Sequence, residues 1–243
     1  MERRKYRFKD IVWKDFSLLA ILIASMIVFS LLGIVIGFLY IDNLSEKIAL
    51  KISVIAQLLA YLVTACSFYF LHMNDFKYHL RKNINFVKNH YLFLIIVTVT
   101  MMVCSTIYNT IMQYLPDGIG FSETQNELEL MGLFDKPAFL PVTFLLIVIG
   151  APLVEEICFR HLLIGELGKK FNFIAMGIVS TILFSLMHVV GAESPFEIGS
   201  YLILAIAMVY VYLKSGRKLI ASVSLHMLNN LISFIFTIIT LYT

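Results

Sequence analysis

Two adjacent glutamates, Glu155 and Glu156, follow a long uncharged run of the sequence, and Arg160 comes four residues after the second of them. The uncharged run, from Pro137 to Val154, is nearly long enough to cross a bilayer. An ionised side chain at the bilayer centre costs about 2.5–3.5 kcal/mol on insertion scales, and such side chains mark functional sites in membrane helices. These three residues are therefore the first candidates for chemistry.

The spacing of the three charges predicts different roles for the two glutamates. Glu156 and Arg160 are four residues apart, so they lie on one face of a helix and can form an ion pair. Glu155 points about 100° away and has no partner on its own helix. We predict that Glu156 and Arg160 form a structural pair and that Glu155 is the reactive group, since a free carboxylate can act as a general base. The alternative is an ion-pair network that only fixes helix packing.

Two further polar sites follow in apolar runs. His188 ends the stretch Phe184-Ser-Leu-Met-His188, and His226 and Asn230 lie four residues apart on one helix face. A single histidine in a membrane helix usually serves as a hydrogen-bonding group in packing. Two histidines, an asparagine and a free glutamate in one bundle favour a catalytic centre.

A carboxylate with two imidazoles can activate water, either directly or through Zn²⁺. In the metal-bound version Glu155, His188 and His226 would be the ligands, with an open fourth position. The His-Glu-x-x-His signature of soluble zinc proteases is absent. In the metal-free version Glu155 and His188 deprotonate water, while His226 and Asn230 stabilise the oxyanion. Both versions predict hydrolysis of a peptide bond within or at the membrane.

The composition requires a membrane scaffold around these residues. Of 243 residues 60% are hydrophobic and 14% are charged, and the mean hydropathy is +0.87, well outside the range of soluble domains. We predict an all-α, polytopic transmembrane helix bundle with about seven spans, in the range six to eight. The expected spans are the charge-free runs Phe16–Ile41, Ile52–Asn74, Tyr91–Pro116, Pro137–Val154 (continuing to about Leu167), Phe171–Ala192, Ile198–Leu213 and Leu219–Thr243. Ile198–Leu213 is the shortest.

The predicted organisation has three parts. Residues 1–15 form a basic cytoplasmic tail, residues 16–136 form the N-terminal membrane helices with an acidic extracytoplasmic loop, and residues 137–243 form the catalytic membrane domain. Cys66, Cys104 and Cys158 lie in apolar runs without metal or disulfide spacing, so we expect small packing residues. No nucleic-acid partner is expected, because an anionic membrane surface explains the basic tail and Trp13 more simply.

The connecting segments alternate in charge. The segments Asp75–His90, Lys169–Lys170 and Lys214–Lys218 are basic, whereas Asp117–Lys136 and Gly191–Gly199 are acidic. The positive-inside rule places the N-terminus and the basic loops in the cytoplasm. With seven spans, the C-terminus is extracytoplasmic. We expect a multi-pass protein of a bacterial plasma membrane, from a Gram-positive organism.

Two local patterns complete the predictions. Ser122-Glu-Thr-Gln125 matches a capping box before a short helix in the acidic loop, either an amphipathic lid or a plain connector. Pro152 removes a backbone hydrogen bond and predicts a kink just before the two glutamates. Gly150 permits a close helix neighbour there.

Three motifs in a fixed order resemble the CAAX-protease and bacteriocin-processing (CPBP) family, also called the Abi family. They are Glu155-Glu156-x-x-x-Arg160, Phe184-x-x-x-His188 and His226-x-x-x-Asn230, and the resemblance covers about residues 137–235. The family includes the prenyl-protein endopeptidase that trims CAAX tails, the type II CAAX prenyl protease. It also includes bacterial members linked to bacteriocin self-immunity and peptide processing.

This resemblance implies an intramembrane endopeptidase and a role for each motif residue. It makes Glu155 the water-activating base, completed by His188 and His226, with Asn230 assisting at the oxyanion and Glu156 and Arg160 holding the geometry. Members are described both as metalloproteases and as metal-independent glutamate proteases, so the cofactor is either Zn²⁺ or none. The implied substrate is a hydrophobic or lipidated peptide or protein, such as a pheromone or bacteriocin precursor.

Two other classes of function compete with the protease. The first is a non-catalytic bacteriocin immunity or partner-binding membrane protein, in which Glu155→Ala would leave function largely intact. The second is a small transporter or proton relay, since buried carboxylates and histidines also occur there. The sequence lacks the paired, interrupted helices in two matching halves that many transporters have.

Overall fold

The structure is a computed structural model that describes residues 6–40, 45–116 and 118–242. All regular elements of these residues are helical, which confirms the all-α prediction. The longer helices are α1 (Ser17–Tyr40), α2 (Glu46–Leu71), α3 (Met73–Asn89), α4 (Tyr91–Gln113), α9 (Phe173–Met187), α10 (Ile198–Lys214) and α11 (Leu219–Tyr242). A further helix contains the glutamates and consists of α6 (Leu140–Phe144), η4 (Leu145–Gly150), α7 (Ala151–Glu156), η5 (Ile157–Leu167) and α8 (Gly168–Phe171). We call it the motif helix.

The helices form a polytopic membrane bundle. Six are long and apolar enough to cross a membrane, by length and composition: Trp13–Tyr40, Glu46–Leu71, Tyr91–Gln113, Pro137–Phe171, Pro195–Lys214 and Leu219–Tyr242. The run Ile198–Leu213, the shortest in the sequence, belongs to one of these six. The run Phe171–Ala192 instead forms α9, an apolar helix of 15 residues, or about 22 Å against a hydrocarbon core of about 30 Å. The count agrees with the predicted range.

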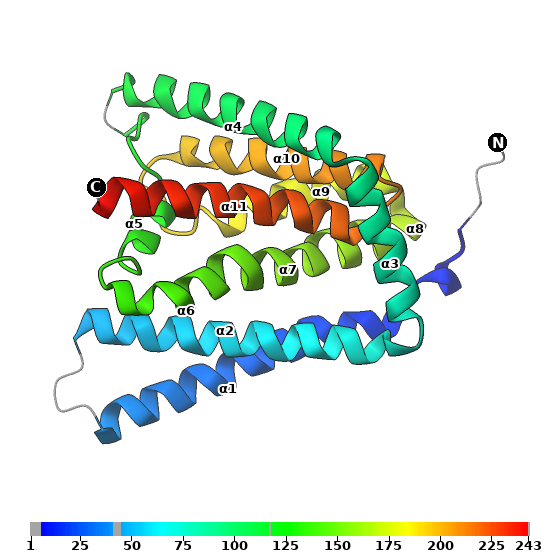
Figure 1. Cartoon of the computed structure of the whole chain (residues 1–243), viewed down its shortest axis with the longest axis horizontal. Coiled ribbons are helices and arrows are strands. Elements are labelled where there is room, and N and C mark those ends of the chain that lie inside the picture. Colours follow the sequence, from blue (N-terminus) through cyan, green and yellow to red (C-terminus); the bar gives the residue numbers. More distant parts are fainter. Residues whose placement is uncertain (1–5, 41–44, 117, 243) are drawn as a thin grey trace.

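Two apolar clusters fill the bundle, and α11 belongs to both. One joins α2, η4, α7 and α11 around Tyr61, Val148 and Phe234. The other joins α4, α9, α10 and α11 around Phe184 and Leu225. In contrast, α1 packs along α2 at the edge of the bundle (Figure 1) and leaves most of its side chains exposed, as expected of a lipid-facing helix. The position of α11 between the clusters directs its polar residues at the motif helix.

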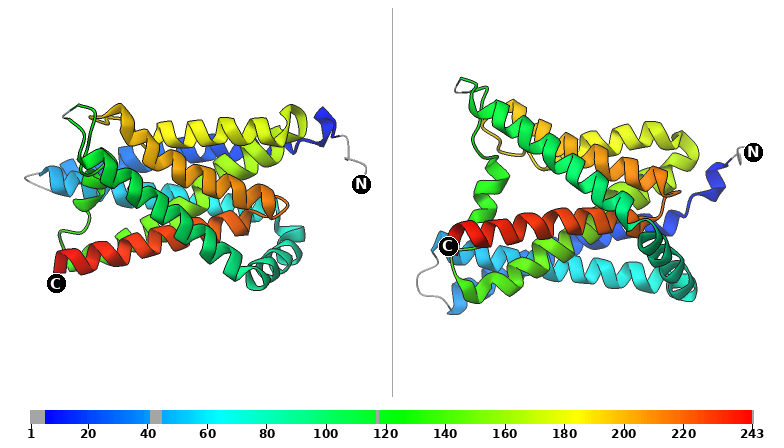
Figure 2. Two further views of the ribbon diagram at one scale, coloured as in Figure 1. Left: turned by 90° about the horizontal axis from the view of Figure 1, so that it is seen from above. Right: turned by 45° about the horizontal axis from the view of Figure 1, so that its top comes forward.

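The charged connections separate to the two ends of the bundle. The N-terminal segment, α3 and α8 lie at one end, and α5 (Gln125–Met131) and the last turn of α11 lie at the other (Figures 1 and 2). The basic segments are therefore neighbours: Lys169 Nζ donates to the Asp10 carbonyl at 3.0 Å, and Lys218 lies over the Phe86 ring. We call this the basic end. The arrangement agrees with the predicted alternation of charge.

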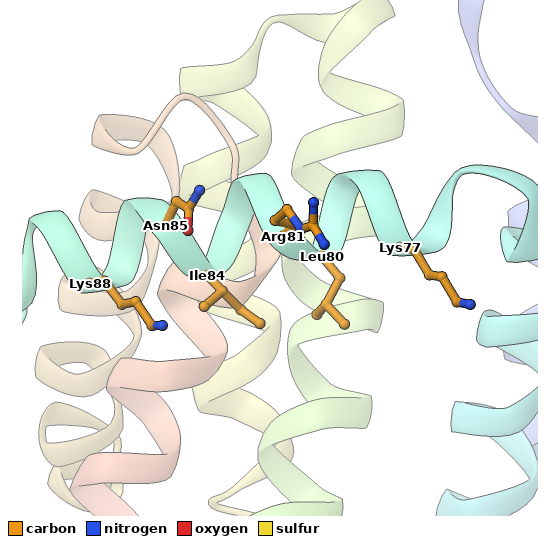
Figure 3. Close-up of a pocket in the computed structure, with 6 residues that line it drawn as sticks. All are labelled: Lys77, Leu80, Arg81, Ile84, Asn85 and Lys88. Atoms are coloured by element: carbon orange, nitrogen blue, oxygen red, sulfur yellow. The ribbon is translucent and has the colours of Figure 1, made fainter.

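The prediction that the segment Asp75–His90 is a loop is wrong, because most of it belongs to α3, a helix of 17 residues. It lies crosswise to the other helices at the basic end (Figure 1). Figure 3 shows Lys77, Leu80, Ile84 and Lys88 on one side of α3. Long basic side chains therefore flank apolar ones on this side of α3, as in a basic helix that lies at a membrane surface.

The described part of the N-terminal segment packs onto the bundle. Ile11 and Asp15 are buried. The Val12 amide donates to Glu166 Oε2 at 2.6 Å, and Lys14 Nζ donates to the Leu71 carbonyl at 3.0 Å. The residues from 6 to 16 thus form part of the fold, while Trp13 is half exposed, as expected of an interfacial aromatic residue.

The capping box in the acidic loop was predicted at Ser122 and Gln125, but the structure has it two residues later, at Thr124 and Glu127. The helix α5 begins after Thr124, whose hydroxyl accepts from the Glu127 amide while the Glu127 carboxylate accepts from the Thr124 amide. Tertiary contacts select this start, because Thr124 Oγ1 also bonds the Tyr201 hydroxyl at 2.8 Å and the Gln125 amide donates to Glu197 at 2.8 Å. The helix is therefore anchored to α10.

Candidate active site

The motif helix changes its hydrogen-bond register around the glutamates. It is π-helical over Leu145–Gly150 and Ile157–Leu167, and α-helical over Ala151–Glu156 between them. The Ala151 amide bonds the Leu146 carbonyl, five residues back. π-Helical turns are rare in proteins, and those that occur are often at functional sites. The two glutamates thus occupy the short α-helical turn between two wider ones.

Pro152 explains one contact of Asn230. In the π-helical register the residue after Ala151 would donate to the Ile147 carbonyl, but proline has no amide hydrogen. Asn230 Nδ2 donates to this carbonyl at 2.9 Å, and Asn230 Oδ1 accepts from Asn229 Nδ2 at 3.1 Å. The contacts of Asn230 therefore join α11 to the motif helix about two turns before the glutamates.

Gly150 lies against α2, as its size predicted. A Cβ atom at this position would approach the Tyr61 ring to 3.3 Å and the Leu145 carbonyl oxygen to 3.2 Å. Both distances are tighter than ordinary van der Waals contact, so a larger residue would push α2 away from the motif helix. The small residue at this turn permits the close packing of the two helices.

Glu156 and Arg160 form the predicted ion pair, and both side chains are 0% exposed. Glu156 Oε1 lies 3.2 Å from Arg160 Nη1 and 3.2 Å from His226 Nδ1. The Arg160 guanidinium also lies 4.6 Å above the centre of the Phe184 ring, close enough for a cation–π interaction. Each buried charge thus has an opposite charge or an aromatic face beside it, which offsets part of its desolvation cost.

Glu155 lies between the two predicted histidines. Its Oε2 atom is 3.9 Å from His188 Nε2 and 3.9 Å from His226 Nε2. The Glu155 and His188 side chains are 12% and 16% exposed, so they can be reached from outside the bundle, whereas Glu156 cannot. The structure therefore brings together Glu155, His188 and His226 from three separate helices.

Hydrogen bonds fix how the two rings face Glu155. His188 Nδ1 lies 2.8 Å from the Phe184 carbonyl, and His226 Nδ1 faces Glu156. Each acceptor requires a proton on Nδ1, so a neutral ring presents the lone pair of Nε2 to Glu155. Glu155 Oε2 is itself a buried acceptor without a hydrogen-bond partner. Three acceptor atoms converge at separations too long for direct hydrogen bonds, a geometry that suits a bridging water or cation.

This donor set fits Zn²⁺ in its chemistry. Two imidazoles with Nδ1 held by an acceptor and one carboxylate form a His₂Glu set, which is known from catalytic zinc sites. The same three acceptors can equally hold a water molecule that donates both of its protons. The residues are thus compatible with both predicted versions of the centre.

No pattern in the sequence indicates one neighbour of this centre, Tyr201. Its ring stacks on His188 with a centroid distance of 4.9 Å and an interplanar angle of 25°. Its hydroxyl bonds Thr124 at the start of α5. Tyr201 lies in an ordinary apolar run, so only helix packing reveals that it orients a site residue.

The fold and this centre define a polytopic helical membrane protein with a buried Glu–His–His cluster. Residues 137–232 match the family model described as type II CAAX prenyl endopeptidase Rce1-like, so this segment of the chain is similar to that family. The chain is also 30% identical over 76 residues to "Putative membrane peptidase YdiL" of Bacillus subtilis (strain 168), which is 31% of this chain and 30% of that protein. The matched segment thus spans less than a third of this relative. No solved structure matches the chain.

Proposed function

We propose that the protein is an intramembrane endopeptidase in which Glu155 activates water. The observation that carries the proposal is the position of one oxygen of the partly exposed Glu155 carboxylate 3.9 Å from the Nε2 atoms of both His188 and His226. The family assignment of residues 137–232 and the likeness to a protein named as a membrane peptidase support the same class of activity. The substrate would be a hydrophobic or lipidated peptide, because the centre lies inside an apolar bundle.

The reaction needs one base and one oxyanion donor. Glu155 takes a proton from water as the water oxygen attacks the scissile carbonyl carbon, and it returns that proton to the leaving amide nitrogen. His188, whose Nδ1 bonds the Phe184 carbonyl, helps to orient the water through Nε2. His226, whose Nδ1 faces the Glu156 carboxylate, donates to the oxyanion in the form that carries a proton on Nε2.

Zn²⁺ is compatible with the same residues. Glu155, His188 and His226 would hold it, and a bound zinc ion lowers the pKa of its water to about 7. In that case Glu156 orients His226 as a ligand, because a carboxylate on the far nitrogen of a ligating imidazole fixes the ring and raises its basicity.

Proteoliposomes containing the purified full chain test the proposal. The substrates are a panel of hydrophobic precursor peptides and a prenylated CAAX peptide, each with and without a chelator. We expect Glu155→Gln to reduce cleavage by about 10²–10⁴-fold, the usual contribution of a general base. Glu129→Gln, at an exposed position of α5, is the matched control and should cleave like wild type. Chelator sensitivity of the wild type would favour zinc over the bare glutamate.

The same preparation distinguishes the competing class. A wild type that cleaves nothing in this panel, together with a Glu155→Gln variant that still protects cells from a bacteriocin, would refute the protease and support an immunity protein. We further propose a plasma-membrane location with the basic end in the cytoplasm, because that end collects α3, α8 and the N-terminal segment.

A further inference from the structure

A second cluster of ionisable side chains lies at the basic end, away from Glu155. Asp15 Oδ2 is 2.7 Å from His161 Nε2 and 3.3 Å from His72 Nε2. Among the described residues, this trio forms a group of histidine and carboxylate ligand atoms that all lie within 4.8 Å of one another. Its members come from three segments: η2 (Trp13–Phe16), the turn after α2, and η5 of the motif helix.

The orientation of His72 gives the first indication of a ligand. Its Nδ1 lies 3.0 Å from the Phe68 carbonyl, which requires a proton on Nδ1. A neutral His72 ring therefore presents the Nε2 lone pair to the carboxylate of Asp15. Two acceptors facing each other at 3.3 Å repel unless a positive charge lies between them. A backbone carbonyl on the far nitrogen of an imidazole is also the usual support of a metal-ligating histidine.

The second, independent indication is an oxygen of Asp15. This residue is 0% exposed, and its Oδ1 atom is buried and has no hydrogen-bond partner among the residues that the structure describes. Buried carboxylate oxygens are almost always hydrogen-bonded or bound to a cation, because an unpaired one loses its hydration without compensation. The free oxygen belongs to the same carboxylate that both imidazoles face.

We infer that Asp15, His72 and His161 form a binding site for a divalent transition-metal ion. Two imidazole nitrogens and one carboxylate suit Zn²⁺ and related first-row ions, whereas Mg²⁺ and Ca²⁺ prefer all-oxygen sets. Zinc ligands at about 2.0–2.1 Å in a tetrahedral arrangement are about 3.3 Å apart. The separation of Asp15 Oδ2 from His72 Nε2 already has this value, and His161 would need to move outward by about half an ångström. The side chains of His72 and His161 are 29% and 20% exposed, which leaves the ion a path from solvent and a position for water.

The site has a structural consequence for the candidate active site. His161 follows Arg160 on the motif helix, so an ion held here joins the N-terminal segment and the end of α2 to the helix that contains Glu155 and Glu156. The nearby Lys14 is exposed, and its ammonium group bonds the Leu71 carbonyl. Solvent therefore screens its repulsion of a bound cation.

A proton is the alternative occupant of the trio. A hydrogen bond from His72 to the Asp15 carboxylate raises the pKa of His72, so without a metal this ring can bind a proton and form an imidazolium–carboxylate pair. The two states differ in metal content, ligand spectrum and response to a chelator, and an experiment can separate them without measuring proteolysis.

The test uses the full-length protein, purified without a polyhistidine tag, in a background that lacks the other candidate ligands: Glu155→Gln, His188→Gln and His226→Gln. Zn²⁺ binding is measured by competition with a chromophoric chelator, and its stoichiometry by elemental analysis. We expect one equivalent of Zn²⁺ in this background. Zn²⁺ binding should weaken by about 100-fold or more in each of His72→Gln, His161→Gln and Asp15→Asn. Loss of a group that only hydrogen-bonds to a metal ligand already costs about 10–100-fold.

His90→Gln is the matched control. The His90 Nδ1 also lies close to a backbone carbonyl, at 2.9 Å, but the residue is exposed on α3, so this variant should bind one equivalent. X-ray absorption of the zinc-loaded background protein should show two imidazole ligands at about 2.0 Å. This measurement does not require substitution of Asp15, His72 or His161. A folded background protein that binds no zinc, or zinc binding that the three ligand variants leave unchanged, would overturn the inference and leave the protonated trio. Because the background already lacks Glu155, the result is independent of the proposed protease.

Discussion

The Nδ1 atom of His226 lies 3.2 Å from Glu156 Oε1 in the interior of the bundle. This contact joins the structural ion pair to the accessible carboxylate, because the opposite nitrogen of the same ring faces Glu155 at 3.9 Å. The His226 ring thus lies between the two adjacent glutamates. Glu156 is buried and paired with Arg160, whereas Glu155 can be reached from outside the bundle. The predictions below follow from this division and from the helices that hold it.

Glu156→Gln should destabilise the protein more than Glu155→Gln. The first change leaves Arg160 buried without its counter-charge, which costs about 3–5 kcal/mol for a buried pair. Among the described residues, Glu155 pairs only with His188 and His226, each at 3.9 Å, so its neutral replacement should unfold like wild type. Denaturant unfolding of both variants in detergent measures the difference. Equal destabilisation would show that the two glutamates do not differ in this way.

Asn230→Leu should destabilise the motif helix in a way that depends on Pro152. The change leaves the Ile147 carbonyl without the amide donor of Asn230, at a cost of about 1–3 kcal/mol. Pro152→Ala restores a backbone N–H five residues after Ile147, so it should recover part of this loss in the double variant. The free energies of unfolding of the four proteins give the coupling.

The control for this cycle is Pro141→Ala, because Pro141 lies in the first turn of α6, where a missing amide hydrogen is tolerated. It should not rescue Asn230→Leu. Strict additivity of Asn230→Leu and Pro152→Ala would contradict the assignment of the Asn230 amide to the Ile147 carbonyl.

Tyr201 should act on the reaction through His188. Tyr201→Phe keeps the ring stacked on His188 and loses the hydroxyl with its bond to Thr124. Tyr201→Leu also loses the stack, worth about 0.5–1.5 kcal/mol. We expect the Leu variant to cleave up to about tenfold more slowly than the Phe variant, with most of the change in kcat. Steady-state cleavage by the two variants is the measurement. Indistinguishable kcat values would exclude a positioning role for the ring.

The basic end should face the cytoplasm. Single cysteines at Lys82 in α3 and Glu129 in α5, both exposed, can be placed in a background that lacks Cys66, Cys104 and Cys158. A membrane-impermeant thiol reagent should label the Glu129→Cys variant in intact cells and the Lys82→Cys variant only after permeabilisation. The reverse pattern would invert the proposed topology, and labelling of both in intact cells would contradict two ends on opposite sides.

The part of the fold that could be predicted from the sequence depends on local properties. Hydropathy located the helices of the bundle, charge located its two ends, and the four-residue spacing of Glu156 and Arg160 specified an ion pair that the structure contains. Helix ends were less predictable, because they depend on single residues and their contacts. Asn172 takes a left-handed φ of 81° and caps α9 with its side chain, and Thr124 begins α5 through contacts with α10.

The sequence by itself determined that a lone glutamate, a buried ion pair and two histidines lie in an apolar helical protein, because residue type and spacing along one helix are enough for that. Only the tertiary structure decided which groups meet. The packing of α9 and α11 against the motif helix brings both Nε2 atoms to Glu155, and it turns Asn230 toward the carbonyl that Pro152 leaves free. The same packing collects Asp15, His72 and His161 at the basic end. These contacts join residues far apart in sequence, so their distances depend on how whole helices pack, and no local pattern specifies that.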